Sequence, residues 1–514
     1  MLYIIILTVI AGTLGLYYFF KESNLFKKHG IPHKTPFPIF GNTAGLFLRR
    51  ESVLDYVKNI YELHPEAKYV GMFEMREPIV VLRDPELIKS IALKNFDLFP
   101  DHRSFIEEEQ DLLFGKILFS LKGEKWRQVR PLLSPAFTSS KMKGMFILMS
   151  DCVVKFSNYL TQMPAEKRIM DIKEAFTRYT NDIIATCAFG ISVDSMRNPN
   201  NEFYIYGKEA TTFNNVAVLK FYLFRSLPWV AKILKIRFVR QKIADFFQDL
   251  VETTIKTRDE NGIVRPDMLQ LMMESRGSKA ELSIEDMVSQ AFSFFFGGFE
   301  STSTLMCFTA HEIAVNRDVH KRLQDEIDQV LEESNGKAPY EIVNNMEYLD
   351  AVINETLRKY PVAPALDRVC IKDFELPPTL PGTKPFTIKK EVGVWIPVYG
   401  LHHDPQYFEN PEKFDPERFI GERKKEILNS GVYLPFGLGP RMCIGNRFAL
   451  METKVLLFHL LARCDFKPCE KTRLPVKIAK DGFNIKPVGG FWLNVSPRKN
   501  IHHTIATNAV NGTH

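Results

Sequence analysis

A cysteine near the end of the chain stands in a setting that could support chemistry. Cys443 follows a glycine-rich turn and precedes an apolar helical pattern in PFGLGPRMCIGNRFALMETK, residues 435–454. The start of a helix supplies positive potential and so favours the thiolate, the form of cysteine that acts as a nucleophile or metal ligand. Gly437, Gly439 and Gly445 would let the backbone approach a flat ligand closely. The competing interpretation is a buried structural thiol, which is a common role of cysteine.

Two further interpretations of this segment have less support. A nucleophilic cysteine needs a base, and no histidine stands close to Cys443 in the sequence. GLGPRM begins like a dinucleotide-binding loop, but Met442 occupies the third glycine position and no strand leads into it. The seven cysteines have neither a disulfide pattern nor zinc-site spacing, so we expect reduced thiols facing the cytosol.

The composition is typical of a globular protein with a modest positive charge. The 514 residues, 45% hydrophobic and 25% charged, can bury a large core. This length often means two or more domains, but no internal linker is visible and a single large domain stays open. The net charge of +6 permits a basic patch for an acidic partner or a membrane and does not indicate nucleic acid binding.

The amino terminus has the features of a membrane anchor. Residues 2–20 carry no charge and are about as long as a helix that crosses a bilayer. Lysines follow at positions 21, 27, 28 and 34, so the positive-inside rule places the rest of the chain in the cytosol. We predict a transmembrane anchor over residues 1–21 and a proline-rich linker over 22–45. A cleaved signal peptide is the alternative, disfavoured because no basic segment precedes the apolar run.

Beyond the linker, helical patterns predominate and would position Cys443. Short strands near residues 70–73 and 79–82 precede a helix that opens at Pro85. A long helix begins at Ser283, where Asp286 completes a capping box, and runs for more than about 25 residues. Strand-like, proline-rich segments occupy residues 361–420. We therefore predict a mainly α protein with small β-sheets (α+β), and a polar tail over residues 501–514.

Four motifs, in order along the chain, resemble those of cytochrome P-450 enzymes. GGFEST lies on the long helix, ETLR carries Glu355 and Arg358, and PERF carries Arg418. Residues 436–445 match the haem-binding signature F-x-x-G-x-R-x-C-x-G at every fixed position. The resemblance covers nearly the whole chain. It implies the cytochrome P-450 haem fold, with residues 46–500 as the haem-containing catalytic domain.

The resemblance also implies a role for each matching residue. Cys443 would be the axial thiolate ligand of the iron of haem b, with Phe436 beside the haem. The residues expected to hold the haem carboxylates are Trp126, Arg130, Arg368 and Arg441, and the planar guanidinium group of arginine suits this role. The residues expected to form a buried structural network behind the haem are Glu355, Arg358 and Arg418. Without the resemblance, a glutamate and an arginine three residues apart would be a surface pair.

Glu300, Ser301 and Thr302 match the residues that deliver protons during oxygen activation in this family. The family usually has threonine where this chain has Ser301. Serine keeps the hydroxyl group but rotates more freely about χ1 than the β-branched threonine. We therefore expect proton delivery to be less tightly coupled to product formation. Gly297 and Gly298 would loosen the helix there and admit a water molecule.

The resemblance predicts a membrane-anchored haem-thiolate monooxygenase on the cytosolic face of the endoplasmic reticulum membrane. The sequence has no flavin or nicotinamide motif, so electrons would come from NADPH through a separate NADPH-cytochrome reductase, and cytochrome b5 could supply others. Basic residues around Cys443 could form the docking patch for an acidic reductase. They are Lys122, Lys125, Arg127, Arg423, Lys424, Lys425, Arg447 and Lys454.

Three aromatic segments are expected to contribute to the substrate pocket, although core packing explains most of their rings. They are DLFPDHRSF (97–105), FYLFRSLPW (221–229) and AFSFFFGGF (291–299). Large apolar pockets favour lipophilic small molecules. FFFGGFES and RKYPVAPALDRVC are most similar to insect family-nine enzymes of the microsomal detoxifying branch, which implies oxidation of xenobiotics such as insecticides or plant toxins. The alternatives are oxidation of an endogenous hormone or fatty acid, a reductase-independent hydroperoxide isomerase, and a non-enzymatic haem-thiolate sensor.

Overall fold

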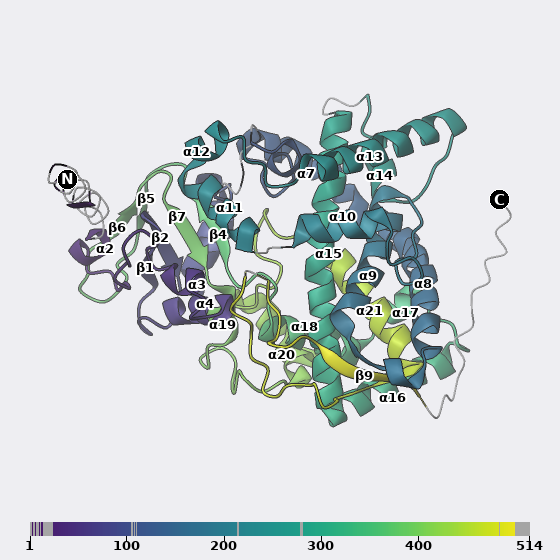
Figure 1. Cartoon of the computed structure of the whole chain (residues 1–514). Helices are drawn as coiled ribbons and strands as arrows, with labels where there is room; N and C mark the ends of the chain where they lie inside the picture. Colours follow the sequence, from purple (N-terminus) through teal and green to yellow (C-terminus); the bar gives the residue numbers. More distant parts are fainter. Residues whose placement is uncertain are drawn as a thin grey trace.

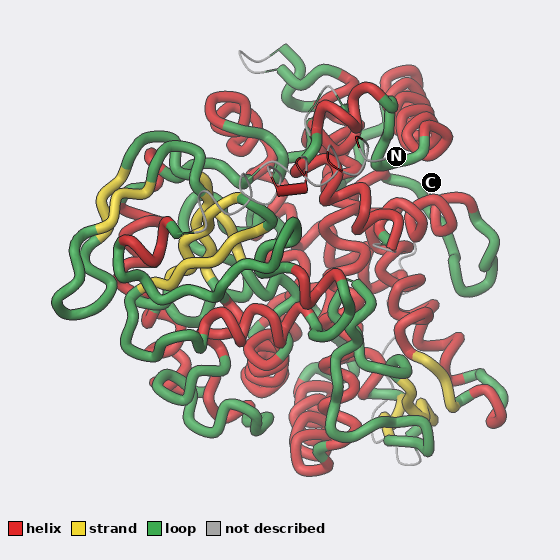
Figure 2. Tube along the Cα trace, turned by 60° about the vertical axis from the view of Figure 1, so that its left-hand side comes forward, coloured by secondary structure: helices red, strands yellow, loops and turns green. Residues whose placement is uncertain are grey.

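The computed structural model describes residues 24–498 apart from 104–105, 107, 109, 213–214, 278–280 and 483, together with five of the first 13 residues. Most of this chain is helical, and the helices gather around one long central helix (Figure 1). The strands form small sheets, and the largest sheet lies beside the helical body (Figure 2). The predicted mainly α architecture with small β-sheets is confirmed.

The central helix, α15 (Ile284–Val315), begins where the sequence predicts. Oγ of Ser283 accepts a hydrogen bond from the Asp286 amide at 3.1 Å, and the Asp286 carboxylate accepts one from the Ser283 amide at 3.2 Å. This capping box satisfies amides that would otherwise lack partners at the helix start. The helix extends over 32 residues and packs most extensively against five other helices. These are α9 (Ile172–Ile184), α10 (Glu202–Thr211), α13 (Gln241–Asn261), α18 (Glu347–Lys359) and α21 (Asn446–Leu461).

The other α-helices surround this set and vary widely in length. They are α2 (Leu25–Lys28), α3 (Ala44–Phe47), α4 (Val53–Tyr61), α5 (Pro85–Lys89), α6 (Leu112–Gly115), α7 (Gly123–Leu133), α8 (Ser139–Thr161), α11 (Asn215–Ser226), α12 (Pro228–Ile233), α14 (Met268–Met273), α16 (Arg317–Glu333), α17 (Tyr340–Asn344), α19 (Val398–His402) and α20 (Gly421–Ser430). The helix predicted to open at Pro85 is present, and the Asp84 side chain accepts a hydrogen bond from the amide of Leu87.

The largest sheet has four strands in the order β1-β2-β7-β4. β1 (Tyr69–Glu74) pairs antiparallel with β2 (Glu77–Leu82), so both strands predicted from the sequence are confirmed with slightly wider bounds. β7 (Gly393–Ile396) runs parallel to β2, and β4 (Leu366–Val369) runs antiparallel to β7. A second sheet joins β3 (Ile169–Asp171), β9 (Trp492–Pro497) and β8 (Cys464–Lys467), and a third joins β5 (Phe374–Leu376) with β6 (Phe386–Ile388).

Buried apolar side chains form one large core among the helices and two smaller clusters on the two faces of the four-stranded sheet. Tyr69 and Phe73 belong to one cluster, whereas Val70 and Met72 belong to the other. This alternation follows from the two-residue repeat of a β-strand. Because both faces are covered, β1 and the neighbouring strands form a fixed base for the loops that leave the sheet.

The segment predicted as the membrane anchor, residues 2–20, lies largely outside the described residues, as does the polar tail. Within the described part of the chain, no helix is both long enough and apolar enough to cross a bilayer. The linker is described from residue 24 onward and contains only the short helices α2 and α3 before residue 48.

Candidate active site around Cys443

Cys443 lies in a loop that is closed by its own backbone hydrogen bonds. The amide of Cys443 donates to the carbonyl of Phe436 at 2.8 Å, and the amide of Met442 donates to that of Gly439 at 2.9 Å. Gly439 has a φ of 76°, and a Cβ atom there would lie 2.2 Å from the carbonyl oxygen of Ala92. Only glycine fits such a position without strain. The loop therefore holds Cys443 beside Phe436, just before α21 begins.

The thiol of Cys443 is accessible, but the surrounding chain removes much of its hydration. Burial raises the pKa of Cys443, while the Gly445 amide and the charge of Arg130 act in the opposite direction. The expected stabilisation of the thiolate by the helix start is therefore present but is outweighed by burial. A bound metal ion would supply the remaining stabilisation, since thiolate ligands lose their proton on coordination.

Arg441 is buried close to the thiol and retains unused hydrogen-bonding capacity. Its Nε donates to the carbonyl of Pro100 at 2.7 Å, and its Nη2 donates to Asp101 Oδ1 at 2.9 Å. Its Nη1 is buried and has no hydrogen-bond partner within the described chain. The guanidinium carbon lies 4.2 Å from the ring centroid of Trp126, a cation–π contact. Burial lowers the pKa of Arg441 to about 10, so the group stays charged at neutral pH.

Two other predicted arginines reach the same region from different elements. Arg368 on β4 is 2% exposed and donates to the carbonyl of Asp367 at 2.6 Å. Its Nε is buried without a partner among the residues described. Arg130 on α7 donates through Nη2 to the carbonyl of Met442 at 2.9 Å, so it holds the loop next to Cys443. Buried unpartnered guanidinium nitrogens are costly and point to an anion as their partner.

The structure separates the three residues expected in proton delivery. Ser301 donates its hydroxyl proton to the carbonyl of Gly297, one turn earlier on α15. Glu300 faces α9, where its Oε1 lies 3.0 Å from Nζ of Lys173. Thr302 is 2% exposed. Ser301 therefore places its hydroxyl group beside Gly297 and Gly298. Glu300 is fixed by its ion pair with Lys173, which the sequence pattern did not reveal.

Glu355, Arg358 and Arg418 meet in the interior. Arg358 forms two hydrogen bonds with the Glu355 carboxylate, each at 2.8 Å, and Nε of Arg418 lies 3.6 Å from Glu355 Oε1. All three residues are at most 2% exposed. The Asp415 amide and the carbonyl of His402 complete the cluster, at 2.9 Å and 3.0 Å. This is a buried network and not the surface pair that the three-residue spacing alone would suggest.

Comparison with known proteins decides the family. Residues 31–493 match the cytochrome P450 family model. The chain is 45% identical to cytochrome P450 9e2 of Blattella germanica, over 93% of this chain and 94% of that one. It is 43% identical to probable cytochrome P450 9f2 of Drosophila melanogaster, over 94% and 97%, and 37% identical to cytochrome P450 6j1 of Blattella germanica, over 96% and 99%. The chain belongs to the cytochrome P450 family. It is a monooxygenase related to insect families 9 and 6.

A cytochrome P450 carries haem b with a cysteine thiolate on the iron, and this structure can accommodate that group. Haem b presents one metal ion and two carboxylates. The accessible thiol of Cys443 suits the metal ion, and the unpartnered nitrogens of Arg441 and Arg368 suit the carboxylates. The donor set therefore fits an iron porphyrin.

In the aromatic segment at residues 291–299 of this P450, some rings belong to the core and others could line the substrate pocket. Phe295 is fully buried and contacts rings from α10 and α13. Phe294 and Phe296 are only partly buried, and their rings contact Phe137 and Phe114. The core interpretation therefore holds for Phe295, whereas Phe294 and Phe296 remain available to line a substrate pocket.

The docking role predicted for two of the lysines is not supported by their positions. Lys454 is 4% exposed and lies 2.7 Å from Asp350 Oδ1, and its Nζ also donates to the carbonyl of Asn344. Lys424 lies 2.8 Å from the other oxygen of Asp350. The prediction is wrong for Lys454, because a buried lysine cannot bind a protein partner. Helical periodicity did not distinguish this interior position from a surface one.

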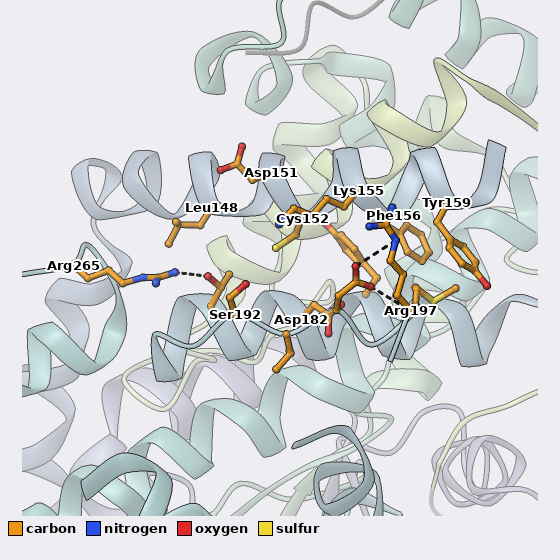
Figure 3. Close-up of a pocket in the computed structure, with 15 residues that line it drawn as sticks. Leu148, Asp151, Cys152, Lys155, Phe156, Tyr159, Asp182, Ser192, Arg197 and Arg265 are labelled. Carbon is orange, nitrogen blue, oxygen red and sulfur yellow. Dashed lines mark hydrogen bonds and ion pairs between the residues drawn. The ribbon is translucent and has the colours of Figure 1, made fainter. Parts of the chain in front are cut away.

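A cavity of about 240 Å³ lies between α8 and α9 (Figure 3). Cys152 on α8 and Asp182 on α9 line it, with Arg265 at one end. Burial raises the pKa of Asp182 to about 6 and that of Cys152 to about 12. None of the residues around Cys443 borders this cavity, so it is not the candidate active site.

Two residues that position the site were not found from the sequence. Asp101 accepts hydrogen bonds from Arg441 and from the amide of Gly123 at the start of α7, at 2.9 Å and 2.8 Å. It thereby fixes the loop arginine relative to the helix that carries Trp126. Lys173 reaches Glu300 from α9, 127 residues earlier in the chain. Both contacts depend on tertiary packing and have no local signal.

Proposed function

We propose that this P450 inserts one atom of O2 into neutral lipophilic xenobiotics, with electrons from NADPH delivered by a separate NADPH-cytochrome reductase. The observation that carries the proposal is the joint placement of the accessible thiol of Cys443 and the unpartnered nitrogens of Arg441 and Arg368. The resemblance of FFFGGFES and RKYPVAPALDRVC to the microsomal detoxifying branch supports the xenobiotic class. Oxidation of an endogenous hormone or fatty acid is the same-class alternative.

We assign the haem-holding roles to the residues that converge on the loop. Cys443 would bind the iron, and Phe436 would lie beside the ring. Arg441 and Arg368 would receive the carboxylates, while Trp126 supports Arg441 through its ring and Arg130 fixes the carbonyl of Met442. When bound, the haem supplies the oxygen-activating chemistry, and the thiolate makes that chemistry favourable by donating electron density to the iron.

The proton needed for oxygen activation would pass through residues of α15. The hydroxyl of Ser301 is bonded to the carbonyl of Gly297, so it is held on the face of the helix next to the glycine pair. Glu300 would connect this position to the protein exterior, because its carboxylate is half-buried and paired with Lys173. Thr302, which is buried, would support the helix and not carry the proton. General acid catalysis requires such a positioned donor.

Membrane association is supported by apolar side chains that face outward on α11, α12 and the linker. Those more than 60% exposed are Ile39, Val216, Leu219, Trp229, Ile233 and Leu234. α3, at the end of the linker, is joined to α11 by the rings of Phe47 and Tyr222, whose centroids are 4.3 Å apart. A large apolar surface of this kind marks an interaction site. With the predicted anchor, it fits an enzyme held on the cytosolic face of the endoplasmic reticulum membrane.

The reductase would dock on the side of the molecule from which Arg447 projects. Arg447 is exposed, lies four residues after Cys443, and forms no ion pair with a described residue. Lys425 on α20 is exposed as well, but it is paired with Glu422. Positive charge near the thiolate ligand would attract an acidic electron donor and raise the association rate. Cytochrome b5 would use the same surface.

The proposal is tested with the full-length haem-loaded protein in membranes that also contain the reductase. We expect the reduced, carbon-monoxide-bound spectrum of a thiolate-ligated haem, and oxygenated products from neutral lipophilic compounds only when NADPH, O2 and reductase are all present. Turnover of hydroperoxides without reductase would instead indicate an isomerase. Spectral binding of ligands without any NADPH consumption would indicate a sensor.

A further inference from the structure

A buried carboxylate holds two arginines together at the end of the four-stranded sheet. Glu74 is the last residue of β1 and is 5% exposed. Its Oε2 accepts a hydrogen bond from Nη1 of Arg103 at 2.8 Å and another from Nη2 of Arg225 at 2.9 Å. We call Glu74, Arg103 and Arg225 the Glu74 cluster. Charge-assisted hydrogen bonds of this length are strong when they are shielded from water.

The Glu74 cluster joins two segments that are expected to contact substrate. Arg103 belongs to the aromatic segment at residues 97–105, and Arg225 belongs to α11, which lies beside the four-stranded sheet (Figure 1). The amide of Arg103 donates to the carboxylate of Asp367 at 2.6 Å. Asp367 is followed directly by Arg368, one of the two arginines proposed to hold the haem carboxylates. Asp367 and Arg368 point to opposite faces of the sheet, but Asp101, two residues before Arg103, binds Arg441. The cluster is therefore connected to the haem site through the 97–105 segment and to α11 through Arg225.

In this cluster two guanidinium groups share one carboxylate. Arg103 and Arg225 are 18% and 11% exposed, so neither is well hydrated. Nε of Arg225 is buried with no hydrogen-bond partner in the described chain. Burial and the charge of Arg225 lower the pKa of Arg103, as expected when like charges are held close together. Without Glu74, the pair would be an unbalanced positive site facing the substrate segments.

The neighbouring charged groups do not replace Glu74. The Asp367 carboxylate is occupied by the amide of Arg103 and by Nδ1 of His102, 3.0 Å away. Burial lowers the pKa of His102, which is therefore neutral at pH 7. Glu77 lies opposite Glu74 in the β1–β2 register, but it is exposed and forms no hydrogen bond with either arginine. Its charge raises the pKa of Arg103 less than that of Glu74 does.

We infer that Glu74 is a specificity-determining residue, which makes the enzyme select neutral lipophilic substrates over lipophilic carboxylates. The inference rests on the proposed function and names its substrate class. Glu74 fills with its own carboxylate the position that a substrate carboxylate would take between Arg103 and Arg225. A lipophilic acid would have to displace Glu74 and leave a buried carboxylate without a partner, which is costly. A neutral molecule avoids this cost. The enzyme therefore selects its substrates by disfavouring the acid as well as by binding the neutral molecule.

The test compares two probes of equal chain length, dodecanol and dodecanoate, at pH 7.5. Each is radiolabelled, and its dissociation constant for the full-length haem-loaded protein is measured by equilibrium dialysis. We expect the wild-type protein to bind dodecanol at least about tenfold more tightly than dodecanoate. In Glu74→Gln, which preserves shape and removes the charge, dodecanoate should bind at least about tenfold more tightly than it binds the wild type. The affinity for dodecanol should change by less than about threefold.

Two variants control for other causes. Glu77→Gln removes an equal charge from the facing position on β2 and should leave both affinities unchanged. Glu74→Gln combined with Arg225→Gln removes the surplus guanidinium group and should abolish the gain for dodecanoate. An equal gain in Glu77→Gln would mean that the gain comes from overall charge alone. Equal gains for both probes would mean that the substitution had merely loosened the packing around the cluster. Either result overturns the inference.

The wild-type comparison keeps the inference testable even if Glu74→Gln fails to incorporate haem. Wild-type protein that binds dodecanoate as tightly as dodecanol would overturn the role of Glu74 without any variant. This outcome is distinguishable from failure of the proposed function. If neutral compounds are oxidised but the two probes bind equally, only the inference fails. If the probes are discriminated but no compound is oxidised, only the proposed function fails.

Discussion

The Nζ atom of Lys173 lies 3.0 Å from Oε1 of Glu300 and also donates hydrogen bonds to other groups of α15. It donates to Oγ of Ser303 at 2.9 Å and to Oγ1 of Thr304 at 2.8 Å. One side chain of α9 thus determines where the acid of α15 points. We regard Lys173 as a positioning residue, because it acts through Glu300.

Changing Lys173 to methionine should weaken the coupling between NADPH consumption and product formation. Glu300 would then be free to adopt other rotamers, and product formed per NADPH should fall at least about twofold, since small displacements of a proton-transfer group can cost up to about 10²-fold in rate. The measurement is the ratio of product to NADPH, together with its pH profile. Lys173→Arg should restore the ratio. Lys208→Met, which removes the exposed partner of Glu174, should leave it unchanged.

Ser301→Ala should retain haem and ligand binding but release more of the consumed NADPH as peroxide. The variant loses the hydroxyl that is bonded to the carbonyl of Gly297. Peroxide and product are measured per NADPH, and Ser301→Thr should form more product per NADPH than the wild type because threonine has fewer χ1 rotamers. Thr309→Ala removes an equivalent hydroxyl from the same helix, bonded to the carbonyl of Leu305, and serves as the control. An unchanged ratio in Ser301→Ala would assign the proton to Thr302 or to water.

Cys443→Ser should abolish the absorption band that a reduced, carbon-monoxide-bound haem shows when its other ligand is thiolate. Of the seven cysteines, only Cys443 is exposed and lies in the loop next to Arg441. Cys307 and Cys464 are buried. Cys307→Ala is the matched control and should keep the band. Retention of the band in Cys443→Ser would move the iron ligand to a different cysteine.

Arg358→Met should destabilise the protein strongly and lower its haem content. The change leaves the carboxylate of Glu355 buried without its main partner, and breaking a buried ion pair in this way costs about 3–5 kcal/mol. Lys425→Met breaks an exposed pair of the same spacing, with Glu422, and should cost less than about 1 kcal/mol. Thermal unfolding of both variants gives the comparison. Similar small losses would contradict a structural role for the buried network.

Asp182 should make the folded state more stable at acidic than at neutral pH, relative to a variant without this acid. Burial raises its pKa to about 6, above the value of about 3.9 in an unfolded chain. The folded state therefore holds a proton that the unfolded chain releases, and the resulting stability is lost as pH rises from about 4 to about 6. The melting temperature of Asp182→Asn minus that of the wild type should increase between pH 5 and pH 7.5.

Much of the fold could be predicted because its signals are local. The Ser283–Asp286 capping box, the strands at 69–74 and 77–82, and the motif around Cys443 depend on residues a few positions apart. The sequence could not reveal that Lys173 reaches Glu300 or that Glu74 joins Arg103 to Arg225, because these pairs are 29 to 151 residues apart. The burial of Lys454 was missed for a related reason. Its partner Asp350 lies on another helix, and a charge on a helical pattern gives no sign of such a partner.

The hydrogen bonds that close the loop around Cys443 have a consequence for the assembly of the enzyme. The bond from the Cys443 amide to the carbonyl of Phe436, and that from Met442 to Gly439, lie wholly within the polypeptide. These two bonds can form without the cofactor, so part of the loop can be ordered before haem binds, and less ordering entropy is lost when it does. Haem can therefore bind after the loop around Cys443 has begun to fold.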